Sequence, residues 1–450
     1  MPYPLNRALQ LPRKLSNQIK LWLRDPENAG RNLLQFTNPP LFESRLVDVI
    51  HPVPMYVKAT VDQPALRLNV LDSNWAKSGM TGGPNTVINL ALRVARKGIT
   101  VRFVSTVNPT TIEPEWFRKH GGALIGGETA PDVLIAHAGN SETPLPVGPG
   151  DIFLATHWST AQQLRAVLPF MKVRQFFYML QEFEAGFYAW SSNYARVVET
   201  YSMDFWPIVN EKLLADFVFS QPLGFLSEPQ TRDRAIVFEP AVDRSIFNSN
   251  SIIRAPTKSN KRQKRLLFYA RPSNARNMFG LGIMALREVA SDPVFDDWEF
   301  LSIGSRGSVP ELQLGNGRVL RCAPWVDYVG YADLLREADL LLCPMFSPHT
   351  SYPVLEMVAC GGLSITNTFA TKSEQALAAL SSRIIGVDPT VAGFAAGLMS
   401  GARRVNAGEG RNASLDSPSD WAMSLEPVAD RMLEIIQGFI TDGSSSGGGS

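Results

Sequence analysis

The sequence of 450 residues contains few cysteines, almost no net charge and no long apolar run. Its three cysteines, Cys322, Cys343 and Cys360, form neither a CxxC spacing nor an even set, so they indicate reduced core thiols rather than a disulfide framework or a zinc site. Lysine and arginine number 43 against 42 acidic residues, which excludes a global charge that would attract nucleic acid. No stretch approaches the roughly 18 apolar residues of a transmembrane helix, and the N-terminus lacks the apolar core of a signal peptide. These absences predict a cytoplasmic protein that meets any anionic ligand at a local site.

The two ends of the chain differ from its middle. Residues 1–60 form a basic extension, in which residues 7–24 carry leucines, an isoleucine and a tryptophan among their charges. As a helix interrupted near Pro12, this segment could lie on an anionic membrane surface, on the inner face of the cell membrane. The alternative is a helix packed on the main body with its basic face in solvent. Residues 443–450 (GSSSGGGS) are typical of a flexible linker.

Residues 61–249 alternate between strand and helix patterns. A strand at 67–71, a glycine-rich turn, a helix at 85–97 and a strand at 101–105 make one βαβ unit. The remaining expectations for this half are strands at 133–136, 152–155, 175–179 and 236–238, with helical stretches within 199–215. This half is predicted to be a Rossmann-like domain.

A basic, polar linker at 250–265 separates this domain from a second α/β series at 266–424. A long amphipathic helix at 425–441 closes the chain. In the second series we expect strands at 266–269, 299–303, 319–321, 340–343 and 363–366, and helices at 280–289, 331–338 and 354–360. The sequence therefore predicts an α/β protein with two Rossmann-like domains facing across a cleft, and a C-terminal helix that crosses back.

The strongest local motif is FYARPSNARN, at residues 268–277. A buried strand leads into a loop with Arg271 and Arg276, and loops at the carboxyl end of a parallel strand point into the ligand crevice. Two guanidinium groups there can hold a diphosphate through bidentate hydrogen bonds and stabilise the charge on a leaving nucleotide. The spacing alone is equally typical of two surface arginines in a turn.

A second motif, SPHTSYPVLEMVACGG, occupies residues 347–362. A polar loop precedes a helix expected to begin near Tyr352 and Pro353, where free N–H groups form an anion site. We expect Glu356 in the first helical turn, facing the crevice, where a carboxylate can accept hydrogen bonds from two vicinal hydroxyls of a ribose. The alternative is that Glu356 merely complements the helix dipole.

Together these two motifs resemble those of retaining GT-B glycosyltransferases. That family has a basic pair, R-x4-[KR], after the first strand of its C-terminal domain, matched here by Arg271 and Arg276. It also has an E-x7-E element ending in P-x-L-E-x-x-A-C-G, and residues 353–361 match its second half. The first glutamate of that element, which contacts donor-sugar hydroxyls in the family, is Pro348 here. The usual hexose donor therefore does not carry over from this resemblance.

The variation SPH-x-SYP-x-LEM resembles a narrower group, the WsaF-like rhamnosyltransferases of bacterial surface polysaccharide assembly. Segments at residues 81–98, 180–201 and 239–247 also resemble this group, and the resemblance covers residues 60–440. It implies a dTDP-β-L-rhamnose donor, a saccharide acceptor and retention at the anomeric carbon.

The same resemblance implies further contacts with the donor. His349 and Ser351 lie on a loop that would cover the phosphate and sugar, although an ordinary capping loop would look the same. The diphosphate would also meet the backbone from Ser351 through Tyr352 to Val354. The backbone around Val329 would meet the nucleobase.

On the acceptor side the resemblance and the pattern name five residues. Gly82 and Gly83 form a turn that faces the reaction centre in the family and allows close backbone approach. His157 follows a strand and could bind the acceptor or the leaving phosphate, or be structural. Glu182 and Glu184 lie among aromatic residues, an arrangement typical both of sugar binding and of a core.

No Asp-x-Asp pair follows a predicted strand, so we expect neither a metal nor a cofactor, with the arginines and a helix N-terminus in the metal's place. Two other hypotheses remain. One keeps the fold and uses a UDP- or GDP-sugar. The other is a non-catalytic nucleotide- or sugar-binding scaffold. The expected partners are a nucleotide-sugar and a saccharide acceptor, either free or lipid-linked, with peripheral membrane contact through the basic N-terminus and no nucleic acid.

Overall fold

A computed structural model describes residues 50–60, 66–80, 82–249, 263–305, 311–411 and 414–445. The predicted membrane segment at 7–24 and most of the predicted linker lie outside the described residues. The chain divides into two compact units, Met1–His51 and Pro52–Ser450, and the description below concerns the second.

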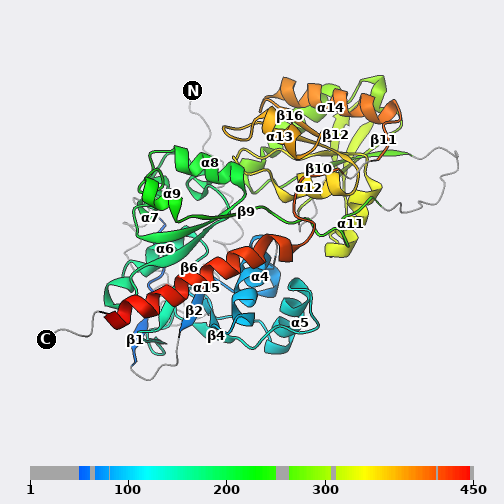
Figure 1. The fold of residues 1–450 in the computed structure, drawn as a ribbon. Coiled ribbons are helices and arrows are strands. Elements are labelled where there is room, and N and C mark those ends of the chain that lie inside the picture. The colour runs from blue at the N-terminus through cyan, green and yellow to red at the C-terminus, as the bar shows by residue number, and fades with distance from the viewer. Residues whose placement is uncertain are drawn as a thin grey trace, which may run out of the picture. The chain divides into compact units, whose positions relative to one another are not determined.

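The first domain is built on a parallel sheet (Figure 1). Within the described residues this sheet has seven strands in the order β4-β3-β2-β6-β7-β8-β9. Its strands are β2 (Arg67–Asp72), β3 (Thr100–Ser105), β4 (Leu134–His137), β6 (Asp151–Ala155), β7 (Phe176–Leu180), β8 (Phe205–Asn210) and β9 (Ile236–Phe238). Its helices are α4 (Gly82–Arg96), α5 (Pro114–Leu124), α6 (Trp158–Leu164), α7 (Ser192–Thr200), α8 (Lys212–Ser220) and α9 (Pro229–Asp233). The short strands β1 (Val57–Ala59) and β5 (Leu145–Val147) pair separately.

Strand β8 shows that the expectation for residues 199–215 was incomplete, because a strand lies between the two helical stretches. Pro207 cannot donate to the ladder, and proline is unusual in a central strand. β8 nevertheless pairs with both β7 and β9. Its burial between these neighbours outweighs the unfavourable local signal.

The second domain repeats the arrangement (Figure 1), with the order β12-β13-β11-β10-β14-β15-β16 among the described residues. The strands are β10 (Lys264–Tyr269), β11 (Trp298–Ile303), β12 (Leu312–Gly315), β13 (Arg318–Cys322), β14 (Leu340–Leu342), β15 (Leu363–Asn367) and β16 (Ile384–Val387). Its helices are α10 (Phe279–Val289), α11 (Tyr328–Glu337), α12 (Tyr352–Ala359), α13 (Glu374–Leu380) and α14 (Val391–Asn406). Among the strands that the structure describes in this sheet, only the edge strand β12 is antiparallel to its neighbour.

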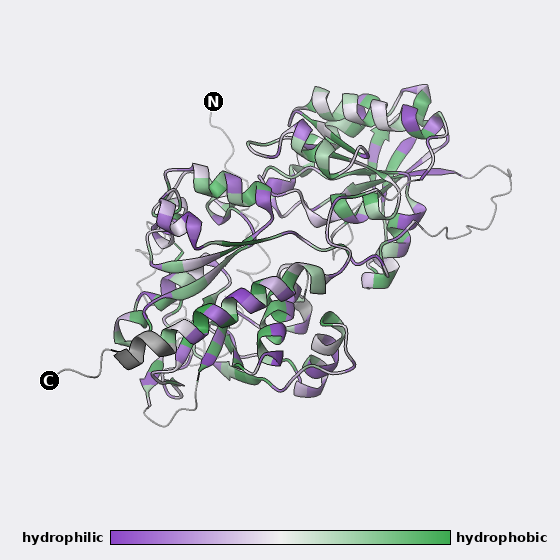
Figure 2. Ribbon diagram, viewed as in Figure 1, coloured by the Kyte–Doolittle hydropathy of each residue, from purple (hydrophilic) through white to green (hydrophobic). Residues whose placement is uncertain are grey.

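The last helix, α15 (Trp421–Ser445), returns to the first domain and packs on α4. Figure 2 shows that it carries both hydrophobic and hydrophilic residues along its length. Leu425, Met432 and Ile436 are buried in the same core cluster as the apolar face of α4. The helix begins four residues earlier than predicted, because the Asp420 carboxylate accepts the N–H groups of residues 422 and 423 at 2.8 and 3.0 Å. It also continues into the predicted tail, as far as Ser445.

Two Rossmann-like domains and a helix that crosses back are therefore confirmed. None of the helices in the described part of the chain combines the length and apolar character needed to cross a membrane.

Candidate functional site

The two motifs of the second domain meet where its strand order reverses. β10 lies between β11 and β14, and in doubly wound sheets ligands bind outside the carboxyl ends of strands at such a point. The loop after β10 carries both arginines, and the loop after β14 leads into α12. The Phe346 N–H donates to the Arg276 carbonyl at 2.8 Å, and the Asn277 amide donates to the Pro344 carbonyl at 3.3 Å. The fold thus joins two segments that are far apart in the sequence.

Arg276 lies between the two domains. Its guanidinium carbon is 4.4 Å from the centroid of the Phe187 ring, and its Nε is 3.6 Å from Glu182 Oε2. Burial lowers the pKa of Arg276, the charge of Glu182 opposes that effect, and the nearby charge of Arg271 lowers the pKa further. Arg271 itself is exposed. Two cations held this close favour an anionic ligand between them.

The start of α12 is as predicted, with Tyr352 as its first residue and Pro353 in its first turn. The Ser351 N–H donates to His349 Nδ1 at 2.9 Å, and the Val354 N–H donates to the Ser351 carbonyl at 3.2 Å. Both groups therefore already have partners within the chain, and a phosphate would have to share them.

The prediction that Glu356 lies in the first helical turn was wrong, because Glu356 is the fifth residue of α12. Complementing the helix dipole, which acts within the first turn, is therefore a weaker explanation for this acid. The Tyr331 hydroxyl donates to Glu356 Oε2 at 3.0 Å. Burial raises the pKa of Glu356 to about 7, and the hydrogen bond from Tyr331 opposes the shift.

Val329 is placed differently from the prediction, which had the helix begin at residue 331. Tyr328 is the first residue of α11, so Val329 lies in its first turn. The helix begins early because the Asp327 side chain accepts the Gly330 N–H at 2.9 Å. The Val329 side chain remains 58% exposed, so this turn is open to a ligand.

Gly82 and Gly83 also differ from the expectation of a turn, since α4 begins at Gly82. A Cβ atom on Gly82 would lie 3.1 Å from Tyr352 Cδ2, and one on Gly83 would lie 3.6 Å from the Gln181 side chain. The Asn210 amide donates to the Tyr352 hydroxyl at 2.8 Å. The beginnings of α4 and α12 therefore approach each other closely, and glycine permits this at position 82.

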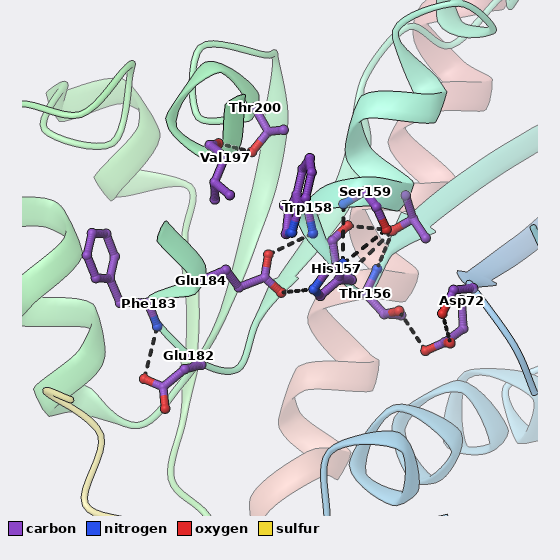
Figure 3. A network of polar contacts seen from close by, with 12 residues as sticks. Asp72, Thr156, His157, Trp158, Ser159, Glu182, Phe183, Glu184, Val197 and Thr200 are labelled. Carbon is purple, nitrogen blue, oxygen red and sulfur yellow. Dashed lines mark hydrogen bonds and ion pairs between the residues drawn. The ribbon is translucent and has the colours of Figure 1, made fainter. Parts of the chain in front are cut away.

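His157 is held by a polar network at the carboxyl edge of the first sheet (Figure 3). It is the N-cap of α6, where its Nδ1 accepts the Ser159 N–H at 3.3 Å. Its Nε2 lies 4.0 Å from Glu184 Oε1. Because Nδ1 accepts, the neutral ring carries its proton on Nε2, toward Glu184. The histidine therefore has a structural role, whether or not it also meets a ligand.

Glu184 points into the protein, toward His157 and Trp158 (Figure 3), and is only 4% exposed. Its Oε2 accepts the Trp158 N–H at 2.7 Å and the Tyr178 hydroxyl at 3.0 Å. Burial raises the pKa of Glu184, and the hydrogen bonds from the Tyr178 hydroxyl and the Trp158 N–H oppose this. Such burial favours a role in positioning His157 over direct contact with an acceptor.

Glu182 turns away from that network, toward the second domain. Its Oε1 accepts a hydrogen bond from the Ser347 hydroxyl, and its Oε2 is the oxygen nearest Arg276. The predicted acceptor residue thus contacts the predicted donor loop. This contact joins both halves of the candidate site.

Sequence analysis missed four polar residues near this site. They are Asp72, Asn210, Glu211 and Lys372. Asp72 and Asn210 end buried strands and Glu211 follows one, a position that could have signalled them. Burial raises the pKa of Asp72, whose Oδ2 lies 3.3 Å from the Thr156 hydroxyl. Lys372 follows a strand end at a greater distance and resembles an ordinary surface lysine in the sequence.

Comparisons with known proteins agree with this architecture. Residues 67–210 match the family model for the WsaF N-terminal domain, and residues 264–399 match that for the WsaF C-terminal domain. The O-antigen biosynthesis protein RfbC of Myxococcus xanthus is 31% identical over 225 residues, which cover 48% of this chain and 15% of that protein.

Two solved structures share the fold. Sucrose-phosphate synthase of Thermosynechococcus elongatus aligns with a TM-score of 0.52 at 12% identity, covering 84% of this chain and 100% of that one. Anabaena HepE in complex with UDP-glucose aligns with a TM-score of 0.50 at 11% identity, with the same coverage. Two facing Rossmann-like domains of this kind form the GT-B fold, which the chain shares with sucrose-phosphate synthase. Because both of its domain models match in order, the chain belongs to the WsaF family.

Proposed function

We propose that this chain transfers L-rhamnose from dTDP-β-L-rhamnose, with retention, onto a saccharide acceptor in bacterial surface polysaccharide assembly. The observation that carries the proposal is the contact between the arginine loop and the loop that leads to α12 and Glu356. Membership of the WsaF family and the printed name of the RfbC relative support the assignment to polysaccharide assembly.

In this proposal Arg271 and Arg276 bind the donor diphosphate. The paired positive charges stabilise the charge that develops on the leaving nucleotide. The start of α12, including Tyr352, adds N–H dipoles to the same site. Glu356 accepts a hydrogen bond from a hydroxyl of the nucleotide's pentose ring, and the first turn of α11 faces the base.

The transfer breaks the bond between the anomeric carbon and the β-phosphate oxygen, and forms a bond from that carbon to an acceptor oxygen on the same face. The acceptor proton passes to the departing phosphate oxygen, so retention needs no separate base. His157, held by Glu184, would orient the acceptor. Closure of the site would exclude water, so that transfer is faster than hydrolysis.

A second candidate, favoured by Glu356, uses a UDP- or GDP-sugar. A ribose offers two vicinal hydroxyls to a carboxylate, whereas the deoxyribose of a thymidine nucleotide offers one. Pro348, in the place of the family's first acid, weakens any inference about the sugar itself.

Thermal-shift titration with dTDP, UDP, GDP and dTDP-rhamnose, with and without EDTA, tests the donor. A ligand at about 100 times its Kd should stabilise the fold by about 2.7 kcal/mol. Selective stabilisation by dTDP ligands, unchanged by EDTA, supports the rhamnosyl donor, whereas preference for UDP or GDP supports the second candidate. No response to any nucleotide would favour a non-catalytic scaffold.

A further inference from the structure

The loop between β14 and α12 has a conformation that its own backbone does not favour. Ser351, just before α12, has a φ of 83°, in the left-handed region. For a residue other than glycine this conformation is unfavourable and persists only where surrounding contacts impose it. We therefore asked which side chains hold the loop.

Side chains from both domains satisfy the loop's backbone. Glu211 accepts the Thr350 N–H at 2.7 Å and its hydroxyl at 2.8 Å. The Ser347 hydroxyl accepts the His349 N–H at 3.1 Å. These side chains all accept N–H or O–H groups. Of the loop's carbonyl oxygens, that of Met345 accepts the Ser347 N–H at 2.9 Å, which leaves its second lone pair for a further donor.

Lys372 supplies that donor from beneath the loop. Its Nζ donates to the carbonyl of Met345 at 2.8 Å and to that of His349 at 3.4 Å, near the two ends of the loop. The residue is 0% exposed. Its own backbone exchanges two hydrogen bonds with Phe369, at 2.9 and 3.0 Å, so its position is fixed.

Holding an ammonium group here is unfavourable for the fold. Burial lowers the pKa of Lys372 to about 8, and the charges of Glu182 and Glu211 oppose this effect. A buried charge is strongly unfavourable unless it is compensated, and an apolar side chain would fill the same space at a lower cost in free energy. This cost indicates that the charge has a use beyond packing.

We propose that Lys372 is a positioning residue of the donor site, whose ammonium group holds the Met345 and His349 carbonyls so that the start of α12 faces the donor phosphates. The inference rests on the proposed donor site. Lys372 acts through the loop and is not itself a catalytic residue.

The test compares Lys372→Met with wild type, using calorimetric titration of dTDP and UDP. Lys212→Met is the matched control, since Lys212 is exposed and pairs with Asp216 on α8. We expect Lys372→Met to weaken nucleotide binding by about tenfold at neutral pH, which corresponds to about 1.4 kcal/mol, and Lys212→Met to leave it unchanged.

A pH series separates positioning by charge from simple packing. Charge-assisted hydrogen bonds are about twice as strong as neutral ones, so wild-type affinity should fall as the pH rises from about 7 to about 9.5 and the ammonium loses its proton. The titratable side chains that face this group are those of Glu182, Glu211 and Cys343, but the fall should vanish in Lys372→Met, which retains all three. If this variant does not fold, a flat wild-type profile would by itself overturn the proposal.

Arg276→Ala distinguishes the failure of this inference from failure of the donor site. If Arg276→Ala loses nucleotide binding and Lys372→Met does not, the positioning role is wrong and the donor site stands. If neither variant changes binding, the donor site is wrong, and the inference with it.

Discussion

Glu356→Gln should stabilise the fold at alkaline pH while weakening nucleotide binding. The pKa of Glu356 is raised by burial from 4.5 to about 7 in the folded protein. Between these values the folded protein holds a proton that the unfolded chain has lost, so stability falls as the pH rises through this window. Glutamine does not ionise, yet it can still accept the hydrogen bond from Tyr331.

The magnitude follows from the two pKa values. Each pH unit between them corresponds to about 1.4 kcal/mol, so the full destabilisation above pH 7 is roughly 3 kcal/mol. Partial exposure of Glu356 makes this an upper limit. At about pH 5 most of the difference should disappear, because the folded carboxyl is then protonated.

Urea unfolding at about pH 5 and about pH 8.5 measures the effect, with the exposed Glu288→Gln on α10 as the control. Nucleotide affinity should fall in Glu356→Gln alone, by about ten- to a hundredfold, since a hydrogen bond to a charged group is worth about 1.5–3 kcal/mol. A stability difference that is the same at both pH values would refute the argument from burial. Unchanged affinity would remove Glu356 from the donor site.

Three other changes test the site and the fold. Arg271→Ala or Arg276→Ala should abolish sugar transfer without altering the circular dichroism spectrum. The control Arg403→Ala, at an exposed position, should leave transfer unchanged. Near-normal turnover in both the Arg271 and the Arg276 variant would reject the diphosphate site. Gly82→Ala, which places a methyl group 3.1 Å from the Tyr352 ring, should lower kcat/KM for transfer clearly while lowering Tm only slightly. An unchanged kcat/KM would contradict the close approach of α4 and α12. Met432→Ala should cost about 2–5 kcal/mol in urea unfolding, because Met432 is fully buried between α15 and the first domain. A loss below about 1 kcal/mol would show that α15 is not firmly packed there.

The candidate site was partly predictable from the sequence, because its motifs are short and local. Arg271 and Arg276 follow a strand, and Pro353 marks a helix start, so both loops could be found without knowing what they touch. Glu182 and Glu184 illustrate the limit. They are two residues apart in the same segment, yet one contacts the donor loop and the other is buried beside His157.

Alternating apolar runs and glycine turns were sufficient to determine two Rossmann-like domains, since local periodicity is set by residues close in the chain. They did not determine α14, a range for which no element was predicted, and the glycines at 393, 397 and 401 disfavour a helix by intrinsic propensity. Tertiary packing reverses that preference: a Cβ on Gly397 would lie 2.9 Å from Val387 and one on Gly401 would lie 2.7 Å from Leu340. Likewise, only the folded chain brings Lys372 beneath the loop before α12 and Glu211 against its side. Those contacts join residues from different strands and domains, and no local pattern encodes which of them will meet.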